Sequence, residues 1–121
     1  MMETLQLNRN TRLNEIKNAF NEKFSMLKLE FFKKSHGESE GSRAELMITS
    51  DEDLESIGFA KDEAVINFDE ATKVSDLEQS FEKVGGLHVQ VFRKSGSVWL
   101  ETIGSDSWTL AEQQNHAIER L

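Results

Sequence analysis

The fold of this chain is decided by a stretch that occurs twice, as TRLNEIKNAF at residues 11–20 and as TKVSDLEQSF at residues 72–81. Both copies have threonine first, an acidic residue fifth and phenylalanine last. A second match follows in each case, LKLEFFKKS at residues 27–35 and LHVQVFRKS at residues 87–95. Self-similarity at a nearly fixed offset indicates a tandem duplication, so each copy predicts the structure of the other.

The second unit is predicted to run strand, helix, strand, strand, helix. Apolar residues alternate where a strand is expected and recur every third or fourth position where a helix is expected. This spacing predicts a strand at 65–68, a helix at 74–84, strands at 87–92 and 98–103 joined by Ser95-Gly96, and a helix from Thr109. Gly85-Gly86 ends the first helix, because glycine adopts the left-handed cap conformation without strain.

Polar residues mark where the helices of this unit begin. Ser75 with Glu78 fits a capping box, although Thr72 is an equally good cap. Thr109 with Glu112 fits a second capping box ahead of the last helix.

The first unit repeats this order with one insertion. The same spacing predicts a strand at 5–7, a helix at 13–24, a strand at 27–31, a weaker strand at 46–48 and a short helix at 51–57 stopped by Gly58. The polar residues 36–43 have no counterpart in the second unit, and we expect them to form a mobile loop.

The fold class that follows is α+β, two tandem βαββα repeats related by pseudo-twofold symmetry. A strand–helix–strand crossover is right-handed and leaves its strands parallel, whereas the hairpin adds an antiparallel neighbour. We therefore expect mixed sheets with helices on one face. Units of this size are marginal alone, so unit 1 (1–60) and unit 2 (61–121) are predicted to form one compact domain that unfolds cooperatively.

Part of the second unit resembles a known fold. The T-x-V-x-x-L motif from Thr72, the strand and hairpin after it, and Asp106-x-x-Thr109-Leu110-x-Glu112 are similar to the helix and later strands of ubiquitin-like β-grasp domains. The opening hairpin and the C-terminal diglycine of that fold are missing, so the resemblance does not imply conjugation. The duplicated arrangement more closely resembles small uncharacterised bacterial proteins of two βαββα units, which implies a fold but no site.

Composition and missing motifs argue against several classes of function. The net charge of −8 opposes binding to nucleic acid, which needs basic surface. The absence of cysteine excludes disulfides and iron–sulfur clusters, and no apolar run is long enough to span a bilayer. Phosphate-binding glycine motifs and a Gly-x-Ser-x-Gly elbow are absent too. We expect a cytoplasmic monomer with no cofactor, no membrane contact and no assigned catalytic or metal-binding residue.

Four apolar residues stand out as candidate binding residues. If Leu87, Val89 and Val91 face the helices, strand alternation turns Phe32, Phe92, Trp99 and Ile103 to the opposite face. Two interpretations remain open. The aromatic side chains either form the contact between the units or make an exposed patch that binds a protein partner.

Charged residues offer weaker candidates. The histidines His36, His88 and His116 share no metal-ligand spacing, and we interpret His88 as a solvated strand residue. Asp51, Glu52 and Asp53 open an acidic stretch that is interpreted as the first turn of a helix, with weak divalent-ion binding as the alternative. The repeated basic pairs are interpreted as solvated strand ends that guard against edge pairing; they are Lys33-Lys34 and Arg93-Lys94.

The leading hypothesis is a non-enzymatic module that binds an unknown protein partner through a sheet edge or the aromatic patch. The alternative is a protein that binds a small molecule or a divalent cation in the groove between the units, with His88 and nearby carboxylates as a weak catalytic group.

Overall fold

The computed structural model describes residues 2–33 and 46–120. It is an α+β structure with two small antiparallel sheets. Its elements are β1 (Glu3–Asn8), α1 (Leu13–Lys23), β2 (Leu27–Phe32), β3 (Glu63–Phe68), α2 (Val74–Gly85), β4 (His88–Ser95), β5 (Val98–Glu101), the 3-10 turn η2 (Ile103–Ser105) and α3 (Leu110–Glu119).

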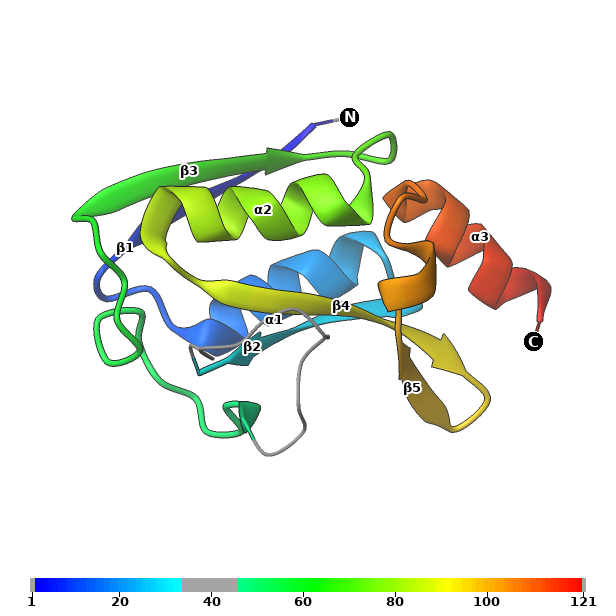
Figure 1. The fold of residues 1–121 in the computed structure, drawn as a ribbon, viewed down its shortest axis with the longest axis horizontal. Helices are drawn as coiled ribbons and strands as arrows, with labels where there is room; N and C mark the ends of the chain where they lie inside the picture. The colour runs from blue at the N-terminus through cyan, green and yellow to red at the C-terminus, as the bar shows by residue number, and fades with distance from the viewer. Residues whose placement is uncertain (1, 34–45, 121) are drawn as a thin grey trace.

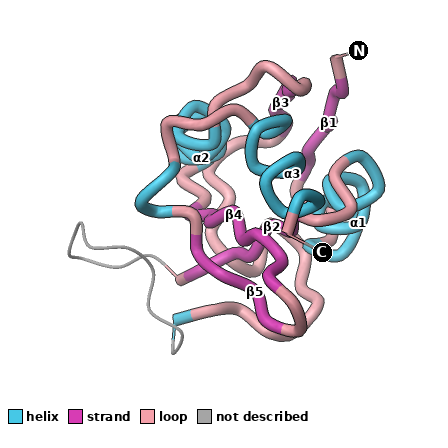
Figure 2. Tube along the Cα trace, turned by 90° about the vertical axis from the view of Figure 1, so that its right-hand side faces the viewer, coloured by secondary structure: helices cyan, strands magenta, loops and turns pink. Residues whose placement is uncertain are grey.

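The core is enclosed by the two sheets and two of the helices. Figure 2 shows the β1–β3 pair above, the β2–β4–β5 sheet below, and α1 and α2 on opposite sides. The helix α3 covers one end of the molecule, which is the right-hand end in Figure 1. The apolar faces of all these elements therefore point at one shared interior.

The sheets differ from the expected mixed arrangement, because every strand pair in the described part of the chain is antiparallel. The crossover from β1 through α1 leads to β2, which lies in the other sheet. Each of these strands instead pairs with a strand from the other half of the chain, β1 with β3 and β2 with β4. The prediction of parallel strands was wrong because the crossover rule assumes that both strands join one sheet.

The register of these two pairs brings matching residues of the halves face to face. Leu5 lies opposite Ile66 in the β1–β3 pair, and Glu30 lies opposite Gln90 in the β2–β4 pair. Glu30 and Gln90 are equivalent in the aligned segments, and Leu5 and Ile66 share the offset of 61 that relates the two copies of the repeat at 11–20 and 72–81.

The turns that lead into α1 and α2 use the same hydrogen bonds. Thr11 Oγ1 accepts a bond from Asn8 N at 2.9 Å, and Thr72 Oγ1 accepts one from Asp69 N at 2.9 Å. The first residue of each helix then donates to a distant carbonyl: Leu13 N to Glu52 O at 2.9 Å and Val74 N to Trp108 O at 3.0 Å.

Both helices bury the face that the sequence predicted. The buried residues are Leu13, Ile16 and Phe20 on α1 and Val74, Leu77 and Phe81 on α2. Aromatic contacts join them to the two sheets, because Phe20 packs on Phe68 and Phe31 meets Phe81 edge to face. Gly86 ends α2 in the left-handed conformation at φ 70°, which confirms the predicted stop.

Several local predictions need correction. Residues 46–48 form an isolated bridge between Met47 and Phe32 rather than a strand, and the loop expected at 36–43 lies outside the described residues. Residues 51–57 are not helical, because Asp53 bridges to Arg12 and Leu54 N bonds to Thr11 O at 2.9 Å. Glu52 O, which a helix would need as an acceptor, is already bonded to Leu13 N at 2.9 Å.

The helix caps were predicted in part. Thr109 and Glu112 form the expected capping box, with bonds of 2.8 and 3.1 Å. The Ser75–Glu78 box was wrong, because Glu78 turns away from the helix start and accepts a bond from β4. Thr72 holds the preceding turn, so its hydroxyl does not cap α2.

Candidate interaction surface at the edge of the three-stranded sheet

Two of the four candidate binding residues are buried together. Phe32 on β2 and Phe92 on β4 stack with ring centroids 6.5 Å apart and planes 18° apart. They retain 6% and 8% of their accessible surface. This stack joins the two halves of the chain and leaves little apolar area for a partner.

Trp99 lies on the same face but is only half-buried. It is opposite Lys94 in the β4–β5 register, one strand away from the phenylalanine stack. The ammonium of Lys28 lies 5.0 Å from the Trp99 ring centroid and 5.5 Å from that of Phe92. The cation therefore covers the space between these two rings, where it gains cation–π attraction.

Ile103 was expected on the strand with Trp99, but β5 ends at Glu101. Thr102 turns inward and donates a hydrogen bond to Val91 O at 3.0 Å, which stops the strand alternation. Ile103 then begins η2 and remains 47% exposed. It lies beside the end of β5 rather than within the aromatic face.

The edges of the three-stranded sheet differ in how they are protected. Residues 46–48 cover part of the outer side of β2, where Lys33 N bonds to Leu46 O at 2.9 Å and Ile48 N bonds to Phe31 O at 2.8 Å. Side chains cover β4 where β5 stops, because Val91 N bonds to the carboxylate of Glu78 and Val91 O bonds to Thr102. The outer side of β5 has no strand or bridge partner among residues 2–33 and 46–120.

The direction of the backbone groups in β5 follows from its register. Lys94 N points to β2, where it bonds to Met26 O at 2.9 Å, so its neighbours Arg93 and Ser95 point to β5. Their partners in β5 are Leu100 and Val98. By alternation, the backbone groups of the other two β5 residues, Trp99 and Glu101, point away from the sheet.

The side chains of β5 are unusually apolar for an exposed edge. Val98 is 53% exposed and Leu100 is 42% exposed on one face, while Trp99 lies on the other. Sequence reasoning missed Val98 and Leu100 because alternation assigned them to the buried face. The strand extends past the helices that would have covered them, as Figure 1 shows for the β4–β5 hairpin.

A partly buried carboxylate lies beside this edge. Glu78 Oε2 accepts bonds from Val91 N at 3.0 Å and from Gln90 Nε2 at 3.2 Å. Burial raises the pKa of Glu78 to about 7, and the nearby charges of Asp106 and Glu101 add to the rise. Glu78 was missed as a site residue because its spacing from Ser75 fitted a capping box.

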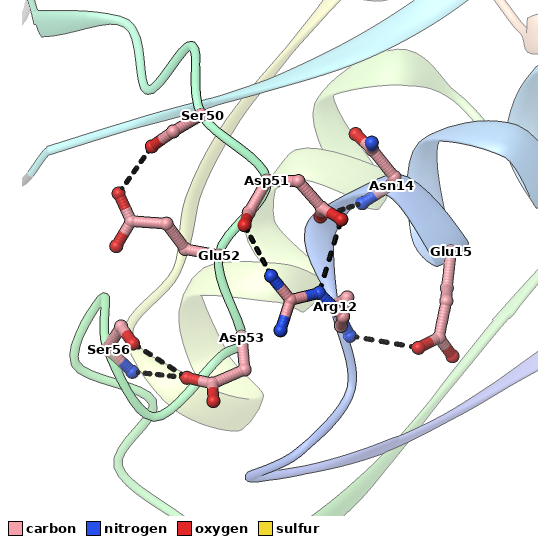
Figure 3. A network of polar contacts seen from close by, with 8 residues as sticks. All are labelled: Arg12, Asn14, Glu15, Ser50, Asp51, Glu52, Asp53 and Ser56. Carbon is pink, nitrogen blue, oxygen red and sulfur yellow. Dashed lines mark hydrogen bonds and ion pairs between the residues drawn. The ribbon is translucent and has the colours of Figure 1, made fainter.

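Within the acidic stretch at 51–53, the carboxylate of Asp51 bonds to the start of α1, whereas those of Glu52 and Asp53 bond to Ser50 and Ser56 (Figure 3). Asp51 Oδ1 accepts a bond from Asn14 N at 3.1 Å and Oδ2 from Arg12 Nε at 3.2 Å. The bond from Asn14 lowers the pKa of Asp51, and bonds from Ser56 lower that of Asp53. The carboxylate of Asp51 therefore caps α1 from a distance, instead of standing in the first turn of its own helix.

The other charged candidates do not meet at one place. His88 Nδ1 is 3.6 Å from Glu82 Oε2, whereas His116 touches Trp108 at 5.3 Å between ring centroids. Both His36 and Lys34 lie outside the described residues. No three His, Cys, Asp or Glu side chains in the described ranges come together so that they could hold a metal ion.

The basic pairs at the strand ends are not equivalent. Arg93 was expected in solvent, but its guanidinium donates to Gln113 Oε1 at 2.6 Å and lies 5.7 Å from the Trp108 ring centroid. Arg93 therefore docks α3 on β4. Lys33 and Lys94 are exposed, as a solvated strand end requires.

A hollow of about 580 Å³ lies at one end of the β1–β3 pair, lined by residues 6–8 and 62–65. Strands from both halves of the chain form it, and whether it binds a ligand, as the alternative hypothesis predicts, stays a prediction. His88 lies on β4 in the other sheet, so the histidine and this hollow do not form one site.

Comparisons with family models, curated proteins and solved structures gave no match, so the resemblances drawn from the sequence remain predictions. No helix in the described part of the chain is long and apolar enough to cross a membrane.

Proposed function

We propose that the chain is a non-enzymatic protein–protein interaction module that binds an extended segment of its partner along β5. The observation that carries this proposal is the outer side of β5, which no other described strand covers. An added strand would form main-chain hydrogen bonds with Trp99 and Glu101, and its side chains would alternate between the two faces.

The side chains around this edge support the proposal. Natural edge strands are usually protected by charges, proline or a covering segment, because an unprotected edge pairs with other chains. In β5 the exposed side chains of Val98 and Leu100 are apolar, and Ile103 adds a third beside the strand end. Contiguous exposed apolar surface is typical of sites that bind another protein.

The proposal is tested by titrating an end-capped peptide of alternating valine and threonine into the labelled protein while recording amide NMR shifts. We expect the largest shifts and the strongest protection from exchange at the amides of Trp99 and Glu101. Val98→Asp should weaken binding at least tenfold. Val65→Asp is the matched control, since Val65 on β3 is 52% exposed and Val98 is 53% exposed.

Shifts centred on β1 and β3, or equal loss of binding in both variants, would show that β5 is not the docking edge. Unchanged spectra up to the solubility limit of the peptide would also contradict the proposal.

We also propose that the two halves arose by duplication of a βαββα unit and are related by an approximate twofold axis. The face-to-face pairs in both strand registers support this, as do the matching turns before the helices. A third correspondence is polar: Lys17 Nζ lies 3.0 Å from Glu30 Oε1, and at the equivalent positions Gln90 Nε2 lies 3.2 Å from Glu78 Oε2.

A further inference from the structure

We infer that the β5 edge selects a segment carrying lysine or arginine opposite Glu101, with apolar residues opposite Leu100 and Val98. This inference rests on the proposed function, because it names the chemistry of the segment that the edge would receive. It is carried by the charges at one end of β5 and by the exposed apolar side chains along the strand.

The end of β5 carries acidic side chains, although Lys28 and Lys94 lie on the same face of the sheet beside Trp99. Glu101 is exposed at the last position of the strand, and Asp106 follows η2. Both are close enough to Glu78 to raise its pKa through their charges. Neither Glu101 nor Asp106 has an ion-pair partner in residues 2–33 and 46–120. A cation placed opposite Glu101 would be attracted by an exposed carboxylate that forms no ion pair within these ranges.

Strand geometry determines which residue of the added strand carries the positive charge. The side chain directly opposite Glu101 on an added strand lies on the same face as Glu101, within cross-strand pairing distance. The next residue along the added strand faces the other side, where Leu100 and then Val98 offer exposed apolar surface. The complementary segment therefore has a basic residue on one face and apolar residues on the other.

The selectivity is tested with two relatives of the valine–threonine peptide, in which the threonines are replaced by lysine in one and by glutamate in the other. We expect the lysine peptide to bind at least tenfold more tightly at low salt, with shifts centred on Trp99 and Glu101. The preference should shrink at high salt, because exposed charges are screened. Glu101→Gln should reduce the lysine preference severalfold, whereas Glu22→Gln on the exposed side of α1 should leave it unchanged.

The outcomes separate this inference from the proposed function. Equal binding of both peptides at β5 would overturn the charge selection but leave edge docking intact. Shifts from the lysine peptide spread over other acidic surfaces, with equal effects of the two variants, would show general charge attraction and overturn the inference. If none of the peptides, charged or neutral, shifts the β5 amides, both proposals are wrong.

Discussion

At the scale of single residues, Glu78 shows how one side chain can replace a missing strand. Its carboxylate accepts the backbone bond of Val91 and the amide bond of Gln90 on the part of β4 that β5 does not cover. The same burial that makes these bonds strong penalises the negative charge. The Glu78 carboxylate therefore links α2 to β4 by hydrogen bonds, but its ionised form lowers the stability of the protein.

We predict that Glu78→Gln makes the protein more stable at pH 8 and leaves its stability unchanged near pH 4. The folded pKa of about 7 lies above the reference value of 4.5, so folding favours the protonated form. The stability that this group contributes is complete below about pH 4.5 and is lost as the pH rises through 7. The expected gain at pH 8 is on the order of 2 kcal/mol.

This prediction is checked by measuring the free energy of unfolding of wild type and Glu78→Gln in urea at several pH values between 4 and 8. Glu22→Gln, an exposed substitution on α1, serves as the control and should follow the wild type. A difference between Glu78→Gln and wild type that does not change with pH would contradict the shifted pKa.

At the scale of elements, the end of α2 depends on a close approach of two segments. A Cβ atom added at Gly85 would overlap two ring carbons of Phe59, whose side chain is buried against that turn. The glycine is thus required by packing, while the neighbouring Gly86 is required by its left-handed conformation.

We predict that Gly85→Ala destabilises the protein by about 1–3 kcal/mol, because inserted volume in a packed site forces neighbours to move. Helix propensity alone would predict that Gly85→Ala increases the stability of the protein by up to about 1 kcal/mol. Gly104→Ala is the control, since nothing lies near its added Cβ, and it should change stability by less than about 0.5 kcal/mol. Thermal unfolding of the Gly85→Ala and Gly104→Ala variants measures both effects. A Gly85→Ala variant more stable than wild type would show that the Phe59 ring moves aside at little cost.

At the scale of the whole molecule, the strand pairs tie the two halves into one structure. Both β1–β3 and β2–β4 join a strand before residue 60 to one after it. The β1–β3 and β2–β4 pairs are therefore lost if either half unfolds, and only the β4–β5 hairpin lies within one half. The two tryptophans, Trp99 and Trp108, both lie in the second half and report on it alone.

We predict that Phe20→Ala, in the first half, lowers the unfolding midpoint seen by tryptophan fluorescence and by circular dichroism equally. Phe81→Ala is its counterpart on α2, and each truncation of a fully buried phenylalanine should cost about 3–5 kcal/mol. A fluorescence transition unmoved by Phe20→Ala would mean that the halves unfold separately.

The local spacing of apolar residues was enough to predict the helices α1 and α2, their buried faces and the alternation of β2 and β4. The sequence also predicted the β4–β5 hairpin, but only the three-dimensional arrangement shows that β1 pairs with β3 and β2 with β4, both antiparallel. The unprotected edge at β5 also follows only from the arrangement of the elements in space. So does the raised pKa of Glu78, which depends on residues of β4, β5 and the segment after η2. Local periodicity fixes which face of an element is apolar, but the partner of that face and the burial of a charge depend on residues distant in the chain.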